Sequence, residues 1–338
     1  MNRTVLKTVN FFFFLTLGLL LLYFAFRGIN FEQMIVDLKN ADYSWVALSL
    51  VFAFFAYLSR AYRWKLLIKP LNFNPSLKNV FYALMIGYIS NLAFPRLGEI
   101  TRCGSLTKTD KIPIDSLIGT VLIERAVDLI VLLIFLFVIF IAKIEYFGSF
   151  IKDNIFIPIY HKFIEAVNFP FYYWIMIVVF IAGFIGLFYF FRKRLKRVVI
   201  IHKMRKLLRG VISGVKTVTK MQNRWAFLLH TLIIWVMYFL MTYVVVFSIP
   251  ATKDLTPIDG VFLLVIGGLG MAAPVQGGIG AFHWIISSGL TLYGISKTDG
   301  LVFATIQHES QVLLVLLLGT ASIILLFLNS HRKRKNIS

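Results

Sequence analysis

Apolar runs close to the length of a membrane span constrain this chain more than any other feature. Six such runs cover residues 9–27, 43–62, 114–142, 171–191, 225–249 and 300–328. A helix that crosses the hydrocarbon core of a bilayer needs about 20 apolar residues. With 59% hydrophobic and only 15% charged residues, the chain has more apolar surface than a water-soluble core can hide. The sequence therefore predicts an all-α integral membrane protein.

Two further apolar runs, 80–94 and 258–273, are shorter and end at proline and glycine. Proline ends a helix because it lacks an N–H donor and clashes with the preceding turn, whereas glycine permits a tight reversal. We therefore expect re-entrant hairpins at about 79–109 and 258–297. The residues expected at their turns are Pro95, Gly98, Pro274, Gly277, Gly278 and Gly280.

Lysine and arginine are concentrated in the loop 192–224, which holds twelve of them and no acid. Smaller basic groups lie near the N-terminus, at 60–69 and at 331–335. Cytoplasmic loops are enriched in these residues. We therefore expect this loop and both termini on the cytoplasmic side of the cell (inner) membrane. The apolar residues interleaved in the loop also suit a helix lying on the anionic leaflet, although a plain topology-setting loop fits too.

These charges favour six full transmembrane helices plus two re-entrant hairpins. The alternative count is eight full transmembrane helices, but that count would place the loop 192–224 outside the cell. The order of elements repeats in the two halves, 1–165 and 166–338, and the hairpins enter from opposite sides. Halves of opposite orientation with helices broken at mid-depth are typical of secondary transporters. The sequence thus predicts an inverted repeat. Two unrelated proline and glycine kinks are the simpler alternative.

Ionisable side chains inside predicted spans mark the candidate site, because each costs about 2.5–3.5 kcal/mol at the bilayer centre. Glu124 and Asp128 lie one turn apart on the same face, with Arg125 on an adjacent face. The alternative is that these three side chains pair with one another and only fix the packing of the helix. The last span carries a polar group at the corresponding depth, which predicts a shared cavity. Its members are Gln307, His308 and Glu309.

The hairpins add further candidates. Arg96, Glu99 and Arg102 lie in the first hairpin, where arginine forks and a helix N-terminus would suit a phosphate. Arginines that extend to the cytoplasmic interface are the alternative. The second hairpin contributes Gln276 and His283 beside its glycines.

Other function classes are disfavoured. The chain has neither a P-loop nor a dinucleotide-binding motif after a strand, which argues against ATP-driven transport by this chain alone. Its single cysteine and its histidine spacing match no zinc or iron motif, so we expect neither a metal nor a cofactor. The net charge of +20 lies beside apolar runs, which favours anionic lipid over nucleic acid as the partner.

Three segments together resemble a known family. They are 91–99 (NLAFPRLGE), 124–128 (ERAVD) and 274–280 (PVQGGIG). The chain is similar over nearly its whole length to the flippase-like membrane family that includes the transmembrane region of lysylphosphatidylglycerol synthases. The resemblance implies two re-entrant hairpins and movement of a charged lipid between leaflets. It also implies roles for Arg96, Glu99, Glu124, Arg125 and Asp128. The sequence departs at His283, where the family often has an acid.

We therefore expect a lipid flippase or lipid-handling secondary transporter, with Arg96, Arg102 and Arg125 binding an anionic phospholipid headgroup. Glu124, Asp128, His308 and Glu309 would shape the cavity and carry protons or bind a cationic headgroup. Two alternatives stay open. One is a membrane-embedded lipid-linked aminoacyl- or glycosyl-transferase with Glu124 or Asp128 as its base. The other is a partner subunit whose charges serve packing.

Overall fold

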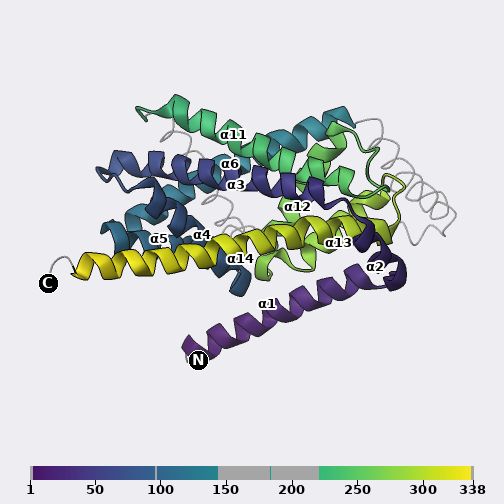
Figure 1. Ribbon diagram of the computed structural model, residues 1–338, viewed down its shortest axis with the longest axis horizontal. Coiled ribbons are helices and arrows are strands. Elements are labelled where there is room, and N and C mark those ends of the chain that lie inside the picture. The colour runs from purple at the N-terminus through teal and green to yellow at the C-terminus, as the bar shows by residue number, and fades with distance from the viewer. Residues whose placement is uncertain (1–2, 96, 144–182, 184–220, 336–338) are drawn as a thin grey trace.

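The computed structural model describes residues 3–95, 97–143, 183 and 221–335, and this part of the chain is helical, without strands. Figure 1 shows the helices running mostly along the long axis of the molecule. The α-helices are α1 (Arg3–Phe26), α2 (Phe31–Asn40), α3 (Tyr43–Ile68), α4 (Leu77–Ala93), α5 (Gly98–Asp110), α6 (Ile114–Ala142), α11 (Arg224–Tyr243), α12 (Pro257–Ala272), α13 (Ala281–Thr291) and α14 (Lys297–Lys335). The 3-10 turns are η1 (Lys69–Leu71), η3 (Val244–Ser248) and η4 (Gln276–Gly278).

Four segments of the described part are long and apolar enough to cross a membrane, and they are Tyr43–Leu71, Ile114–Ala142, Arg224–Ser248 and Lys297–Leu328. A fifth is obtained if α1 and α2 count as one bent span. The multi-pass membrane character predicted from the apolar runs is thus confirmed, whereas the count of six spans plus two hairpins is not. The expected span 171–191 lies almost wholly outside the described residues, as does the basic loop at 192–220.

The amphipathic segment after the first span forms its own helix. α2 is bent by 90° from α1. Gly28, with φ 78°, lies in the connection between the two helices. Asn30 caps α2 by accepting a hydrogen bond from the N–H of Gln33 at 3.1 Å. Because α2 lies nearly perpendicular to α1, it is suited to the membrane interface.

The first broken segment consists of α4 and α5, which pack against each other. Gly87 and Gly98 lie where the two backbones meet, and a Cβ added to Gly98 would overlap the carbonyl oxygen of Gly87. The side chain of Asn91 accepts a hydrogen bond from the N–H of Gly98 at 2.7 Å. Gly98 is therefore the first residue of α5 and permits close packing, while Pro95 lies in the preceding turn.

The second broken segment consists of α12, η4 and α13. Pro274 follows α12, and three glycines adopt positive φ, as expected at a tight reversal: Gly277 at 57°, Gly278 at 81° and Gly280 at 80°. α12 and α13 pack together, and η4 contacts α4 of the first broken segment. The two breaks therefore meet inside the molecule.

The remaining helices enclose this meeting point. α3 lies along α11, and α14 crosses the molecule against α4 and α13 (Figure 1). α6 packs on α5, α12 and α3. Division into an inverted repeat with halves 1–165 and 166–338 stays a prediction, because the described residues stop at 143 and, apart from 183, resume at 221. The predicted sidedness of loops and termini likewise stays a prediction.

Candidate functional site

Two carboxylates on α6 form the centre of a buried ionic cluster. Glu124 is fully buried, and the side chain of Asp128 is 17% exposed. They lie four residues apart on a helix, which places both on one face. That face points to α3 and α5, and the two acids share the partners Arg60 and Arg63 there.

Three arginines from two other helices pair with these acids. Arg60 of α3 contacts Glu124 closely and reaches Asp128 at 3.3 Å. Arg63 of α3 lies 2.7 Å from Asp128 and 3.5 Å from Glu124. Arg102 of α5 binds the second oxygen of Glu124 at 3.0 Å. We call these five residues the arginine cluster.

Aromatic and hydroxyl groups surround the guanidinium planes. Arg102 lies 4.5 Å over the ring of Trp64, whose indole N–H donates to Thr120 at 2.9 Å. Arg60 donates to the hydroxyl of Tyr238 at 2.8 Å. Such stacking and hydrogen bonding fix the orientation of the arginines.

The arginine cluster holds more positive than negative charge. Three guanidinium groups face two carboxylates, so one positive charge remains uncompensated within the cluster. Three buried nitrogens also have no hydrogen-bond partner among the described residues, namely Nε of Arg60, Nε of Arg63 and Nη1 of Arg102. A buried charge without a partner is costly, so this arrangement favours binding of an anion.

A second polar cluster lies where the second broken segment meets α14. Nε2 of His308 is 2.9 Å from the carbonyl oxygen of Gly277, and its Nδ1 is 3.0 Å from Oε1 of Glu309. Nε2 of His283, on α13, is 3.5 Å from the same carboxylate oxygen. We call His283, His308 and Glu309 the histidine cluster. Their ligand atoms all lie within 4.8 Å of one another, so they form a candidate metal site.

Other predicted residues lie around these two clusters. Gln307 donates to the hydroxyl of Thr242 at 3.0 Å, and Gln276 is buried in η4. Tyr57 is hydrogen-bonded to Gln311 at 3.4 Å. Tyr57 also makes an edge-to-face contact with the ring of Tyr88, which lies under Arg60, so this pair connects α14 with Arg60. Side chains thus link the polar residue Gln311 of α14 to the arginine cluster. A shared cavity between the polar groups of the two halves stays a prediction.

The remaining charges of the first predicted site lie apart from the buried acids. Arg125 pairs with Glu99 at 3.0 Å, and their side chains are 45% and 30% exposed. Arg125 therefore does not pair with Glu124 or Asp128, its neighbours in sequence. Arg96 lies outside the described residues.

Sequence reasoning missed Arg60 and Arg63, which were interpreted as cytoplasmic charges just after the second span. The structure instead continues α3 to Ile68 and buries both arginines. A signal was present in the sequence, because the apolar residues Tyr57, Ala61, Trp64 and Ile68 keep a helical spacing past residue 62. A helix that ended at residue 62 would not show this spacing through the arginines.

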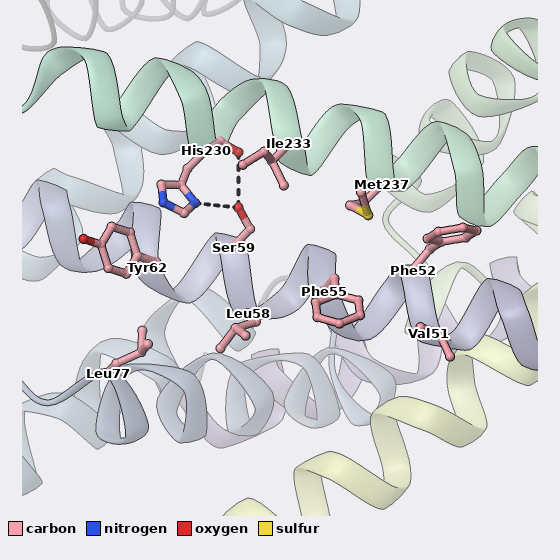
Figure 2. Close-up of a pocket in the computed structure, with 10 residues that line it drawn as sticks. All are labelled: Val51, Phe52, Phe55, Leu58, Ser59, Tyr62, Leu77, His230, Ile233 and Met237. Carbon is pink, nitrogen blue, oxygen red and sulfur yellow. Dashed lines mark hydrogen bonds between the residues drawn. The ribbon is translucent and has the colours of Figure 1, made fainter.

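An apolar groove lies on the other side of α3. Its volume is about 530 Å³, and Figure 2 shows its lining from α3, α11 and the start of α4. Ser59 and His230 form a polar pair in it, with the hydroxyl 2.8 Å from Nδ1 (Figure 2). The rest of the lining is apolar apart from Tyr62, and it consists of Val51, Phe52, Phe55, Leu58, Leu77, Ile233 and Met237.

The chain is similar in sequence to known membrane proteins. The sequence matches the family described as lysylphosphatidylglycerol synthase TM region over residues 11–319. It is also similar to a UPF0104 membrane protein of Methanocaldococcus jannaschii, with 30% identity over 142 residues. That match covers 41% of this chain and 40% of the relative's length. No solved structure matches the chain.

Proposed function

The chain belongs to the family of lysylphosphatidylglycerol synthase transmembrane regions, and we propose that it moves a charged phospholipid between the leaflets of the membrane. The arginine cluster would bind the anionic headgroup. The observation that carries this proposal is the uncompensated positive charge among buried arginines, each of which has one nitrogen without a partner among the described residues.

A phosphate suits this cluster chemically. Arginine presents planar N–H donors that match phosphate oxygens, and such bonds are stronger where water is excluded. Arg102 contributes to this fit because its buried Nη1 has no partner in the described part of the chain, while its Nη2 donates to Glu124. Arg60 and Arg63 remain paired with both acids. We therefore place the headgroup at Arg102 and leave Arg125, which pairs with Glu99, outside the site.

The groove along α3 supports the proposal by offering a place for the lipid's acyl chains. One face of α3 carries Arg60 and Arg63, and another face contributes Phe55 and Ser59 to the groove. A volume of about 530 Å³ lies within the range of ligand pockets. A lipid held this way would keep its headgroup inside the protein and its tails in an apolar surface. Rocking of the two halves would then alternate the headgroup's access to the two leaflets.

Leaflet exchange of fluorescent anionic lipids in proteoliposomes tests the proposal. Wild-type protein is expected to accelerate exchange over empty vesicles, and Arg102→Gln is expected to abolish most of the acceleration. This substitution leaves two arginines facing two acids, so the cluster becomes neutral and Glu124 keeps Arg60 and Arg63 as partners. The fold should survive for that reason.

Arg125→Gln is the matched control, because it also removes an arginine from an ion pair, but at an exposed position. It is expected to retain the wild-type exchange rate. Equal rates in wild-type and empty vesicles for several headgroups would overturn the proposal. The lipid-linked transferase is less well supported, because Glu124 and Asp128 are both engaged by arginines and neither is a free base.

A further inference from the structure

The histidine cluster has hydrogen bonds that fix the proton on one of its imidazoles. Nε2 of His308 lies 2.9 Å from the carbonyl oxygen of Gly277, and a carbonyl oxygen only accepts. Nε2 of His308 therefore carries its hydrogen and donates. In the neutral ring this leaves a lone pair on Nδ1, which faces Oε1 of Glu309 at 3.0 Å. Two acceptors that face each other at this distance need either a proton or a metal cation between them.

The second imidazole converges on the same point. Nε2 of His283 is 3.5 Å from Oε1 of Glu309, and the side chain of His283 is 3% exposed. Its Nδ1 is buried without a hydrogen-bond partner among the described residues. When Nε2 binds an ion, the hydrogen of the neutral ring lies on Nδ1, so among the described residues His283 lacks the outer hydrogen bond that His308 has.

We propose that His283, His308 and Glu309 bind one divalent transition-metal ion of the zinc class. Zinc bonds to nitrogen and oxygen at about 2.0–2.2 Å, which separates the ligand atoms of a tetrahedral site by about 3.3 Å. The two separations from Glu309, 3.0 and 3.5 Å, lie on either side of that value. Nδ1 of His308, Nε2 of His283 and Oε1 of Glu309 are the three ligands.

The hydrogen bond to Gly277 supports this assignment independently of distance. Histidines that bind a metal commonly donate their other N–H to a backbone carbonyl, which fixes the tautomer and orients the ring. Gly277 offers its carbonyl from the turn of the second broken segment, at φ 57°. Two imidazoles and one carboxylate favour zinc, iron or cobalt over magnesium or calcium, which prefer oxygen ligands.

Three protein ligands leave a coordination position open. Structural zinc sites usually have four protein ligands, whereas an open position accepts water or a substrate atom. Glu309 is 52% exposed, so an ion can reach the site from the protein surface. The ion would join α13 and α14 and, through His308, hold the turn of the second broken segment against α14.

Metal titration of purified protein tests the proposal. The chain, freed of any histidine tag and stripped with a chelator, is titrated with Zn²⁺ in competition with a chromophoric chelator, and Co²⁺ is used as a spectroscopic probe. One tight Zn²⁺ per chain and the intense visible absorption of tetrahedral Co²⁺ are expected. Loss of a direct ligand should weaken binding by more than the about 10–100-fold typical of outer hydrogen-bond partners.

His283→Ala, His308→Ala and Glu309→Gln are the test variants, and His230→Ala is the matched control. His230 lies on α11 and bonds to Ser59, away from the cluster. Zinc bound elsewhere on the chain is common to all variants and is subtracted. Glu309→Gln removes only a charge at a half-exposed position, so it should stay folded even if a histidine variant does not. The proposal is overturned if Glu309→Gln binds Zn²⁺ as tightly as the wild-type chain, or if the wild-type chain shows no tight site.

Discussion

The arginine cluster and the histidine cluster occupy corresponding places with opposite chemistry. Each lies where a broken helix meets a long helix, α5 with α6 in one case and α13 with α14 in the other. The first holds an excess of guanidinium groups, and the second holds only imidazoles and one carboxylate. The same structural device therefore favours an anion in one place and a cation in the other.

Burial separates the carboxylates of the two clusters as well. Every side chain of the arginine cluster is at most 17% exposed, whereas Glu309 is 52% exposed. A charge that is buried cannot lose its partner without a large cost, but an exposed one is solvated by its surroundings. Glu124 should therefore be essential to stability, whereas neutralisation of Glu309 should be tolerated. Four experiments break or sharpen this comparison.

Glu124→Gln is expected to have the largest effect. It leaves three buried arginines with Asp128 alone, and breaking a buried ion pair costs about 3–5 kcal/mol. The corresponding change Glu309→Gln should cost less than about 1 kcal/mol, because that carboxylate is half exposed. Thermal unfolding in detergent, without added metal, measures both. Similar losses in the two variants would contradict the difference in burial.

Alanine substitutions at the two breaks come next. In Gly98→Ala the new Cβ overlaps the rigid backbone carbonyl of Gly87, and a loss of about 3 kcal/mol is expected. In Gly277→Ala the Cβ lies 2.8 Å from the flexible tip of Leu92, and the positive φ adds about 1–2 kcal/mol. The same unfolding assay ranks them. A larger loss in Gly277→Ala would mean that the second turn, rather than the first packing contact, limits stability.

Ligand-induced stabilisation should separate the two clusters. A ligand present at 100 times its Kd stabilises the folded state by about 2.7 kcal/mol. Anionic lipid is expected to stabilise wild-type protein and His283→Ala but not Arg102→Gln. Zn²⁺ is expected to stabilise wild-type protein and Arg102→Gln but not His283→Ala. If either variant lost both responses, the clusters would be one coupled site.

The exposed pair of Arg125 and Glu99 is expected to contribute least. Exposed ion pairs contribute about 0.2–1 kcal/mol, and this pair has side chains that are 45% and 30% exposed. Glu99→Gln should lower stability within that range. The loss should shrink at high salt, because salt screens exposed charges. A loss close to that of Glu124→Gln would place this pair in the buried network.

Much of the helical framework could be predicted from local sequence. The apolar runs indicate α3, α6, α11 and α14, and proline and glycine locate both breaks within a few residues. The shared face of Glu124 and Asp128 follows from their spacing alone. These features depend on residues that are close in sequence, where helical periodicity is decisive.

The partners of these acids could not be predicted in the same way. Arg60 lies 64 residues before Glu124, and arginine beside an apolar run is also what the positive-inside rule produces. The two explanations place the same residue in water or in the protein interior, and only the packing of α3 against α6 and α11 decides between them. The histidine cluster likewise brings together His283 and His308, which are 25 positions apart, and His308 is held by the carbonyl oxygen of Gly277. No short sequence motif records such a contact.

The docking of α1 has a consequence for how the chain is built in the cell. α1 packs on α13 and η4, with the backbone of Gly280 close to the carbonyl oxygen of Gly18. Lys297, at the start of α14, donates to the carbonyls of Phe24 and Arg27 at 3.0 and 2.8 Å, near the end of α1. During synthesis, α1 thus reaches Lys297 only after some 270 further residues have been made. Until then, the face of α1 that packs on α13 and η4 must be covered by lipid or by a chaperone.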